Sequence, residues 1–216
     1  MHEQIIIEVG ANNGQHTEPL HKKYPTIPIY SFEPVPILYE KLKEEYKNNT
    51  KVNIFPFAID IENSTKNFYI NESGDKRCDI RYPHGCSSLY PFVDDVDESF
   101  KTIFGENRPS KFRNLEIIKI KTIRLDSFLE EFNFAGEIVY LHCDAQGNDI
   151  NVLKSLGKYL LNVREGQIEV AAQAELYKNT QNTYKEAVDF LVQNQFAVHI
   201  PNGVNRHEAD IYFSRV

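Results

Sequence analysis

The stretch from Gln4 to Gly14, which reads QIIIEVGANNG, decides the fold predicted for this chain. Its first six residues form a short apolar run rich in isoleucine, which is typical of a buried parallel strand. The run ends in a turn with a glycine at each end, and glycine both permits a tight turn and lets a ligand approach the backbone. In an α/β sheet such a turn lies at the carboxyl edge, where ligands bind.

The rest of the chain alternates apolar strand patterns with amphipathic helix patterns. Further strands are expected at 28–32, 52–58, 67–70, 116–122, 137–143, 167–172, 196–200 and 210–213, and helices up to residue 23 and at 36–48, 125–132, 149–161 and 183–194. The order predicts an α/β fold with a mostly parallel central sheet, an antiparallel C-terminal strand and helices on both faces. The alternation at 116–122 favours an antiparallel edge strand. We expect one domain over residues 1–216, cut from a longer polypeptide, with a lid or insertion at 71–113.

Composition bounds the classes of function. The 216 residues carry a net charge of −7 without an obvious basic patch, so no nucleic-acid partner is expected. No apolar run approaches the ~20 residues of a membrane span, and no signal peptide is recognisable. Three cysteines, Cys78, Cys86 and Cys143, follow neither a CxxC nor a zinc spacing, so we expect free thiols. A soluble, cytoplasmic protein with a small-molecule or glycan acceptor is predicted, and its oligomeric state is left open.

The second strand ends in Glu33, in the place where a carboxylate accepts hydrogen bonds from the ribose hydroxyls of an adenine nucleoside. This pairing of turn and acid fits either NAD or S-adenosylmethionine. The turn is not GxGxxG, because Asn12 occupies the second glycine position, which counts against NAD or FAD. The chain also lacks GxxxxGK[ST], so a P-loop NTPase is excluded.

A series of short motifs follows along the chain. In order they are Glu8-Val9-Gly10-Ala11-Asn12-Asn13-Gly14, Phe32-Glu33-Pro34, Phe57-Ala58-Ile59-Asp60, Ser87-Ser88-Leu89, Thr122-Ile123-Arg124-Leu125-Asp126-Ser127, Asp144-Ala145-Gln146-Gly147, Val152-Leu153, Gln167-Ile168-Glu169 and Leu176-Tyr177-Lys178. The ordered set closely resembles that of the FkbM family of methyltransferases and covers nearly the whole chain. The resemblance implies a Rossmann-like class I fold, S-adenosylmethionine as methyl donor, S-adenosylhomocysteine as product, and a hydroxyl acceptor on a sugar or a secondary metabolite.

The resemblance also implies which residues surround the donor. They are Glu8, Gly10, Ala11, Asn12, Asn13, Gly14, Glu33, Pro34, Ala58, Ile59, Asp60, Ser87 and Ser88. Glu8 and the first turn would face the methionine portion, and Glu33 would hold the ribose. Ala58 and Ile59 would flank the adenine, with Asp60 near its amino group.

Asp144 is the candidate catalytic base, because it ends a buried strand and a carboxylate there can accept a proton from a hydroxyl nucleophile. The alternative is a helix-capping aspartate. His142, two residues before Asp144, lies on the same strand face. It is a candidate second base or substrate contact, or else a hydrogen-bonded core histidine. Glu169, on the next core strand, would join Asp144 in binding substrate or a divalent metal, although a metal is not favoured. Acceptor contacts are expected at Gln146, Gln173 and Tyr177.

Several alternatives stay open. The family usually has Lys, Glu and Glu where this chain has His142, Gln146 and Asp149, so a non-catalytic cofactor-binding module of the same fold is one alternative. An NAD-linked oxidoreductase is another. Ser87 and Ser88 would bond the donor or belong to a plain polar loop.

Overall fold

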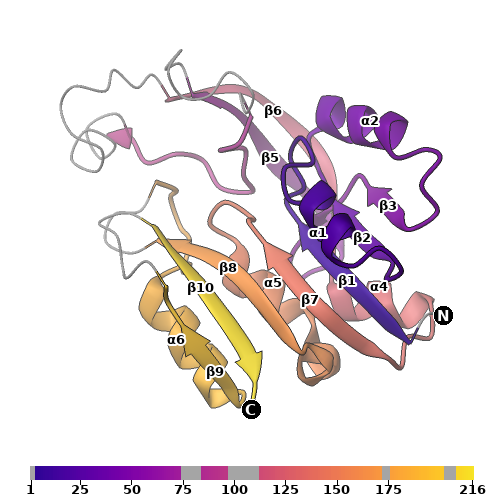
Figure 1. Ribbon diagram of the computed structural model, residues 1–216. Coiled ribbons are helices and arrows are strands. Elements are labelled where there is room, and N and C mark those ends of the chain that lie inside the picture. The colour runs from indigo at the N-terminus through magenta and orange to yellow at the C-terminus, as the bar shows by residue number, and fades with distance from the viewer. Residues whose placement is uncertain (1–2, 74–83, 97–111, 172–175, 202–207) are drawn as a thin grey trace.

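The computed structural model of the protein describes residues 3–73, 84–96, 112–171, 176–201 and 208–216. The described strands form a seven-stranded central sheet in the order β3-β2-β1-β7-β8-β10-β9 and a three-stranded sheet in the order β4-β6-β5 (Figure 1). The strands are β1 (Gln4–Val9), β2 (Ile29–Phe32), β3 (Val52–Phe55), β4 (Ala58–Ile59), β5 (Ser64–Ser73), β6 (Phe112–Ile123), β7 (Glu137–Cys143), β8 (Glu165–Ala171), β9 (Phe196–His199) and β10 (Glu208–Arg215). The helices are α1 (Thr17–Lys23), α2 (Pro36–Glu45), α4 (Leu125–Glu131), α5 (Asp149–Ser155) and α6 (Tyr184–Gln193), with a 3₁₀ helix at Gly157–Asn162.

Strand β1, at the centre of the sheet, is buried on both faces, as its apolar run predicts. Strand β1 pairs in parallel with β2 and β7, and β7 pairs in parallel with β8. Side chains alternate between the two faces of a strand, so Ile5 and Ile7 pack with Leu153 of α5 on one face, while Ile6 packs with Leu20 of α1 on the other. Strand β10 is antiparallel to both β8 and β9. The predicted Rossmann-like α/β fold is therefore confirmed.

The three-stranded sheet was not predicted as a separate unit. The expected strand at 52–58 is divided between β3 in the central sheet and β4 in the small one, and Pro56 lies between them, where it cannot donate a ladder hydrogen bond. The antiparallel strand expected at 116–122 is confirmed as part of β6, which pairs antiparallel with β5. Only the end of β6 departs from the expected edge position, because Thr122 and Ile123 also pair in parallel with β4. Its alternation reflects one buried face, with Ile120 in the core and Ile117 exposed, and this pattern does not distinguish an edge from a centre.

The predicted helix at 149–161 also has a break. Helix α5 ends at Ser155, and a 3₁₀ helix begins at Gly157, whose φ of 51° is left-handed. A Cβ atom on Gly157 would lie 2.5 Å from the Asp126 carboxylate. Glycine at the end of a helix commonly adopts this conformation, which explains the shortened element.

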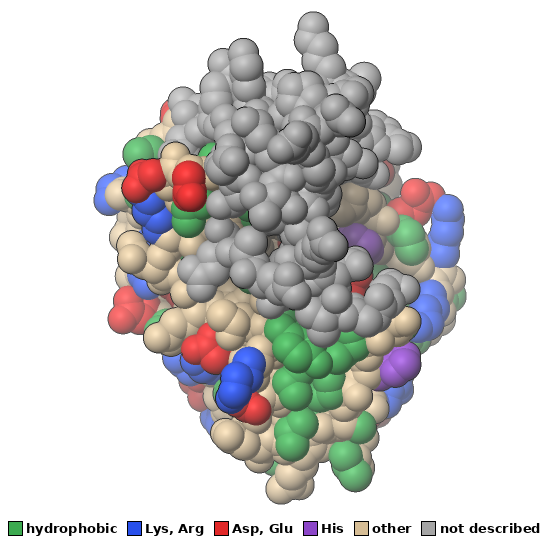
Figure 2. Space-filling model, turned by 90° about the vertical axis from the view of Figure 1, so that its left-hand side faces the viewer, with side chains coloured by type: hydrophobic (Ala, Val, Ile, Leu, Met, Phe, Trp, Pro, Cys, Tyr) green, Lys and Arg blue, Asp and Glu red, His purple; other side chains and the backbone are tan. Residues whose placement is uncertain are grey.

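The surface in Figure 2 shows acidic and basic side chains interspersed among the described residues, with hydrophobic side chains gathered in the lower half of that face. Among the helices described, none is long and apolar enough to cross a membrane.

The carboxyl ends of β1, β2 and β7 converge on Gly10. The backbone N–H groups of Gly10 and Ala11 donate to the Phe32 carbonyl at 3.0 and 3.1 Å, and the Asp144 N–H donates to the Val9 carbonyl at 2.9 Å. Gly10 has a φ of 80°, and a Cβ atom there would lie 2.0 Å from the Asp144 carbonyl oxygen. Only glycine therefore fits between the two turns.

We predict that Gly10→Ala lowers the free energy of unfolding by at least about 2 kcal/mol, because strain and a backbone clash coincide. Urea denaturation measures this loss, with Ala197→Ser on the exposed side of β9 as a control expected within about 0.5 kcal/mol of wild type. A wild-type midpoint for Gly10→Ala would show that the two turns are not in close contact.

Candidate functional site

A cavity lies between the carboxyl edge of the central sheet, the small sheet and the segment 84–89. The predicted donor-site residues in its wall are Gly10, Asn12, Glu33, Pro34, Ala58, Ile59 and Ser87. Two further predicted site residues, Asp144 and Gln146, line the same cavity. The structure thus brings together residues from five distant parts of the sequence.

Much of the remaining wall is apolar and was not among the predicted site residues. It includes Val35, Leu38, Phe57, Phe68 and Leu89. Leu38 and Phe68 belong to a buried cluster between α2 and the small sheet, so the second sheet supplies one side of the cavity. In the sequence, only the hydrophobic positions of α2 and β5 could have suggested that the small sheet forms part of the cavity wall.

Glu33 is the best-defined polar group in the cavity wall. Its Oε2 accepts the Asn12 backbone N–H at 2.6 Å, and its Oε1 accepts the Val35 backbone N–H at 2.8 Å. Burial raises the pKa of Glu33 to about 8, and the charges of Glu8 and Asp144 act in the same direction. Each carboxylate oxygen still has a lone pair for a ligand hydroxyl.

Glu8 lies behind the wall and does not line the cavity. Its Oε2 accepts the hydroxyls of Thr17 at 2.8 Å and Ser31 at 2.5 Å, whereas its Oε1 is buried with no partner among the described residues. Burial raises its pKa to about 7. Of the other turn residues, Ala11 is fully buried, and Gly14 donates its N–H to the Ala11 carbonyl at 2.8 Å. Asn13 lies in the turn without lining the cavity.

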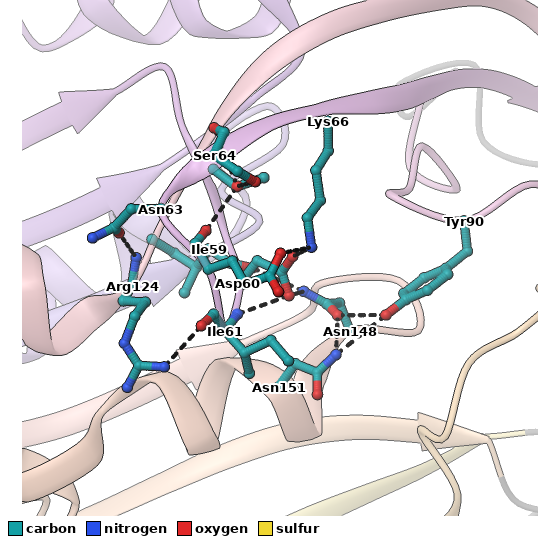
Figure 3. Close-up of polar contacts among 12 residues, drawn as sticks. Ile59, Asp60, Ile61, Asn63, Ser64, Lys66, Tyr90, Arg124, Asn148 and Asn151 are labelled. Carbon is teal, nitrogen blue, oxygen red and sulfur yellow. Dashed lines mark hydrogen bonds and ion pairs between the residues drawn. The ribbon is translucent and has the colours of Figure 1, made fainter.

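Asp60 is 2% exposed and is held by protein groups (Figure 3). One carboxylate oxygen contacts the Lys66 ammonium at 2.5 Å, and the other accepts the Ile61 backbone N–H at 2.8 Å. The Asn148 amide lies 3.4 Å from the latter oxygen. Asp60 therefore supports the Ala58–Ile59 wall from behind and does not itself line the cavity.

Asn148 is a buried cavity residue that the sequence analysis missed. Its Nδ2 donates to the Ile59 carbonyl at 2.9 Å, and its Oδ1 accepts the Tyr90 hydroxyl at 3.0 Å and the Asn151 amide at 2.8 Å (Figure 3). It thereby joins β4, α5 and the segment that carries Tyr90. Its position at the N-cap of α5 was the one available signal, because asparagine is favoured there.

A row of carboxylates crosses the carboxyl edge of the sheet beside the cavity. Asp144 follows Cys143, which pairs with Ile168, so Glu169 is its neighbour on β8, and Asp210 pairs with Glu169 on β10. The pKa of Asp144 is raised, with burial as the main cause and a hydrogen bond from Gln146 acting against it. No group of three or more His, Cys, Asp or Glu side chains suited to a metal occurs within the ranges described.

Gln146 bridges this carboxylate row. Its Nε2 lies 2.5 Å from the Asp144 Oδ1 and 3.3 Å from the Glu169 Oε2, and its Oε1 accepts the Tyr177 hydroxyl at 2.7 Å. The Ser88 hydroxyl donates to the Gln146 carbonyl at 2.6 Å, so Ser88 fixes the turn and does not line the cavity. Tyr177 is 5% exposed.

His142 is 4% exposed and stacks on His16 with ring centroids 4.1 Å apart. Burial lowers its pKa to about 3, helped by the nearby His16, so the imidazole is neutral over the physiological range. Its Nδ1 has no partner among the residues described, and the ring does not line the cavity. Gln173 and the parts 74–83 and 97–111 of the expected lid lie outside the described residues.

Comparison with known proteins gives a family match over most of the chain. The family model described as the methyltransferase FkbM domain matches residues 8–198. No curated protein matches the chain significantly. A solved FkbM methyltransferase from Methylobacillus flagellatus KT is 8% identical, with a TM-score of 0.48, and the alignment covers 99% of this chain and 44% of that one. The chain therefore spans less than half the length of that structure.

Two other solved structures are similar at comparable levels. Fibrillarin from Aeropyrum pernix, in complex with natively bound S-adenosyl-L-methionine, is 10% identical with a TM-score of 0.47, covering 98% of this chain and 66% of that one. A precorrin-6y C5,15-methyltransferase from Geobacter metallireducens GS-15 is 8% identical with a TM-score of 0.46, and the alignment covers 100% of this chain and 82% of that one.

The raised pKa of Glu8 predicts a pH dependence of stability. Because the folded pKa of about 7 lies above the ordinary 4.5, the folded chain keeps a proton that the unfolded chain has released. This stabilisation is complete below pH 4.5 and is lost as the pH rises through about 7. In Glu8→Gln this stabilisation should persist, because the glutamine side chain does not ionise. The variant therefore gains stability relative to wild type between about pH 5 and about pH 8.

Urea denaturation at several pH values measures this difference. Glu44→Gln, on the exposed side of α2, is the control and should follow the wild-type profile. A constant difference between Glu8→Gln and wild type across this range would contradict the raised pKa.

Proposed function

Because the chain belongs to the FkbM family of methyltransferases, we propose that it is an S-adenosylmethionine-dependent O-methyltransferase whose acceptor is a hydroxyl of a sugar or glycan. The observation that carries the proposal is a single cavity lined by the glycine turn, by Glu33 and by Asp144. The first two suit the donor, and the third suits a hydroxyl acceptor.

The residues of the cavity fit such a donor. The buried Oδ1 of Asn12 has no partner among the described residues, and it can accept a hydrogen bond from an ammonium or hydroxyl group. The two oxygens of Glu33 can accept ribose hydroxyls in addition to the backbone bonds that orient them. Phe57, Ala58 and Ile59 offer an apolar wall to a purine ring.

When bound, S-adenosylmethionine supplies a methyl group on a positively charged sulfur, which a hydroxyl oxygen can attack by direct displacement. Asp144 accepts the proton that the hydroxyl loses, because it lines the cavity and is one of the groups within reach of a ligand there. Its position at the end of a buried strand holds it in place, and alignment supplies much of the acceleration in such reactions.

The polar groups beside Asp144 favour an acceptor with several hydroxyls. Glu169 and Asp210 lie in register on the next two strands, and Gln146 contributes an amide. Carboxylates accept hydroxyl hydrogen bonds, and an amide both donates and accepts them. A sugar offers several hydroxyls within one small ring, and this is the support for placing it here.

The donor site is tested by calorimetric titration with S-adenosylhomocysteine, with NAD as the control ligand. We expect micromolar binding to wild type and a loss of at least about tenfold in Glu33→Ala, since two hydrogen bonds to the ribose are lost and each contributes about 0.5–1.5 kcal/mol. Glu44→Ala is the matched surface control and should bind as wild type does. A wild type that binds only NAD, or neither ligand, would contradict the proposal.

The base is tested separately with Asp144→Asn. We expect methyl transfer to a panel of methyl glycopyranosides to fall by about 10²-fold or more, because an amide cannot accept the proton. Binding of S-adenosylhomocysteine should stay within about threefold of wild type, because Asp144 acts on the acceptor. Unchanged turnover in Asp144→Asn would rule out this residue as the base.

A further inference from the structure

Gln146 sits at the centre of a chain of hydrogen bonds that connects the carboxylates of the site with a buried tyrosine. It has a left-handed φ of 48°, which is uncommon outside glycine, so the surrounding contacts must hold it in place. Its amide nitrogen faces Asp144 and Glu169, and its amide oxygen faces the Tyr177 hydroxyl. The side chain is thus bonded at both ends.

The direction of this amide matters for Asp144. In the observed direction the NH₂ group donates to the Asp144 Oδ1 at 2.5 Å, which favours the charged carboxylate. In the reversed direction the amide oxygen would face the same carboxylate oxygen, and the two would repel unless Asp144 held a proton. Whatever fixes the amide therefore affects the ability of Asp144 to accept a proton.

Tyr177 is well placed to fix it. The tyrosine hydroxyl has one proton, and among the described residues two acceptors lie within hydrogen-bond distance of it, the Gln146 Oε1 at 2.7 Å and the Cys86 carbonyl at 3.0 Å. The contact with Gln146 is the shorter of the two, and the Cys86 carbonyl also accepts the Asn71 amide at 2.7 Å, so we assign the hydroxyl proton to Gln146. The ring itself is held by stacking on Phe92 with centroids 5.4 Å apart.

We propose that Tyr177 is a positioning residue of the acceptor site, whose hydroxyl holds the Gln146 amide with its NH₂ toward Asp144 and Glu169 so that Asp144 meets the acceptor as a carboxylate. This role rests on the proposed function of Asp144 as base. Tyr177 acts through Gln146, since its ring is buried against Phe92 and it does not line the cavity.

The surroundings of Asp144 explain why it needs a hydrogen-bond donor from Gln146 to stay ionised. Among the described residues, the ionisable groups that interact with it are His16, Glu33, Cys143, Asp149, Glu169 and Asp210. Burial and the charge of Asp210 favour the protonated form of Asp144, whereas His16 and the hydrogen bonds from Gln146 and Glu169 favour the ionised form. Loss of the oriented amide removes one of these few stabilising contacts.

The test is a ¹³C NMR titration of the side-chain carboxyls in labelled protein, with the Asp144 resonance assigned by its absence in Asp144→Asn. This titration needs neither a methyl donor nor a methyl acceptor. In Tyr177→Phe we expect the pKa of Asp144 to rise by about half a unit to one unit, the equivalent of one neutral hydrogen bond. Tyr90→Phe is the matched control, because its hydroxyl bonds to Asn148, and it should leave this titration unchanged.

A second variant separates orientation from general loosening. Gln146→Met keeps the side-chain length and removes the amide, so it should raise the pKa of Asp144 at least as much as Tyr177→Phe does. The double variant Gln146→Met/Tyr177→Phe should then show no further rise, since Tyr177 would have nothing left to orient. A purely structural role predicts additive effects.

An unchanged titration in Tyr177→Phe with a wild-type thermal midpoint, an equal rise in Tyr90→Phe, or additivity in the double variant would each overturn the proposal. Failure of the proposed function gives a different result. In that case S-adenosylhomocysteine does not bind to wild type, while the carboxyl titration still reports whether Tyr177 orients Gln146.

Discussion

The close approach of the Gly10 turn to the Asp144 backbone is the contact on which the site depends. A Cβ atom at Gly10 would lie 2.0 Å from the Asp144 carbonyl oxygen, so the carboxyl ends of β1 and β7 can meet only at a glycine. The same turn is fixed against β2, because its Gly10 and Ala11 N–H groups donate to the Phe32 carbonyl. Its Asn12 N–H donates to the Glu33 carboxylate. One short stretch thus sets the positions of both the donor-side and the acceptor-side carboxylates.

The site concentrates acidic groups where water is excluded. Glu8, Glu33, Asp144 and Asp149 all have raised pKa values, and burial is the largest cause for each. Several also raise one another, because like charges in a low-dielectric region repel. A positively charged donor would relieve this repulsion, whereas its neutral product would not. The arrangement therefore suits a ligand that enters with a positive charge and leaves without it.

The sequence predicted the central sheet well, because its signals are local. The isoleucine run of β1 and the turn after it, and the acids Glu33 and Asp144 at strand ends, all follow from short patterns. The small sheet was missed as a unit because β4 is two residues long and its pairing with β6 is long-range. Likewise, nothing near Asn148 or Tyr177 in the sequence shows that their partners lie in segments about 60 to 90 residues away.

In the proposed function, one cavity holds the donor against Glu33 and presents the acceptor to Asp144. A crystal structure of the chain with S-adenosylhomocysteine is the most direct test. We expect the ribose hydroxyls within hydrogen-bond distance of the Glu33 carboxylate, the purine against Phe57 and Ile59, and the sulfur toward Asp144. A ligand bound elsewhere, or bound in this cavity with its ribose away from Glu33, would contradict this arrangement.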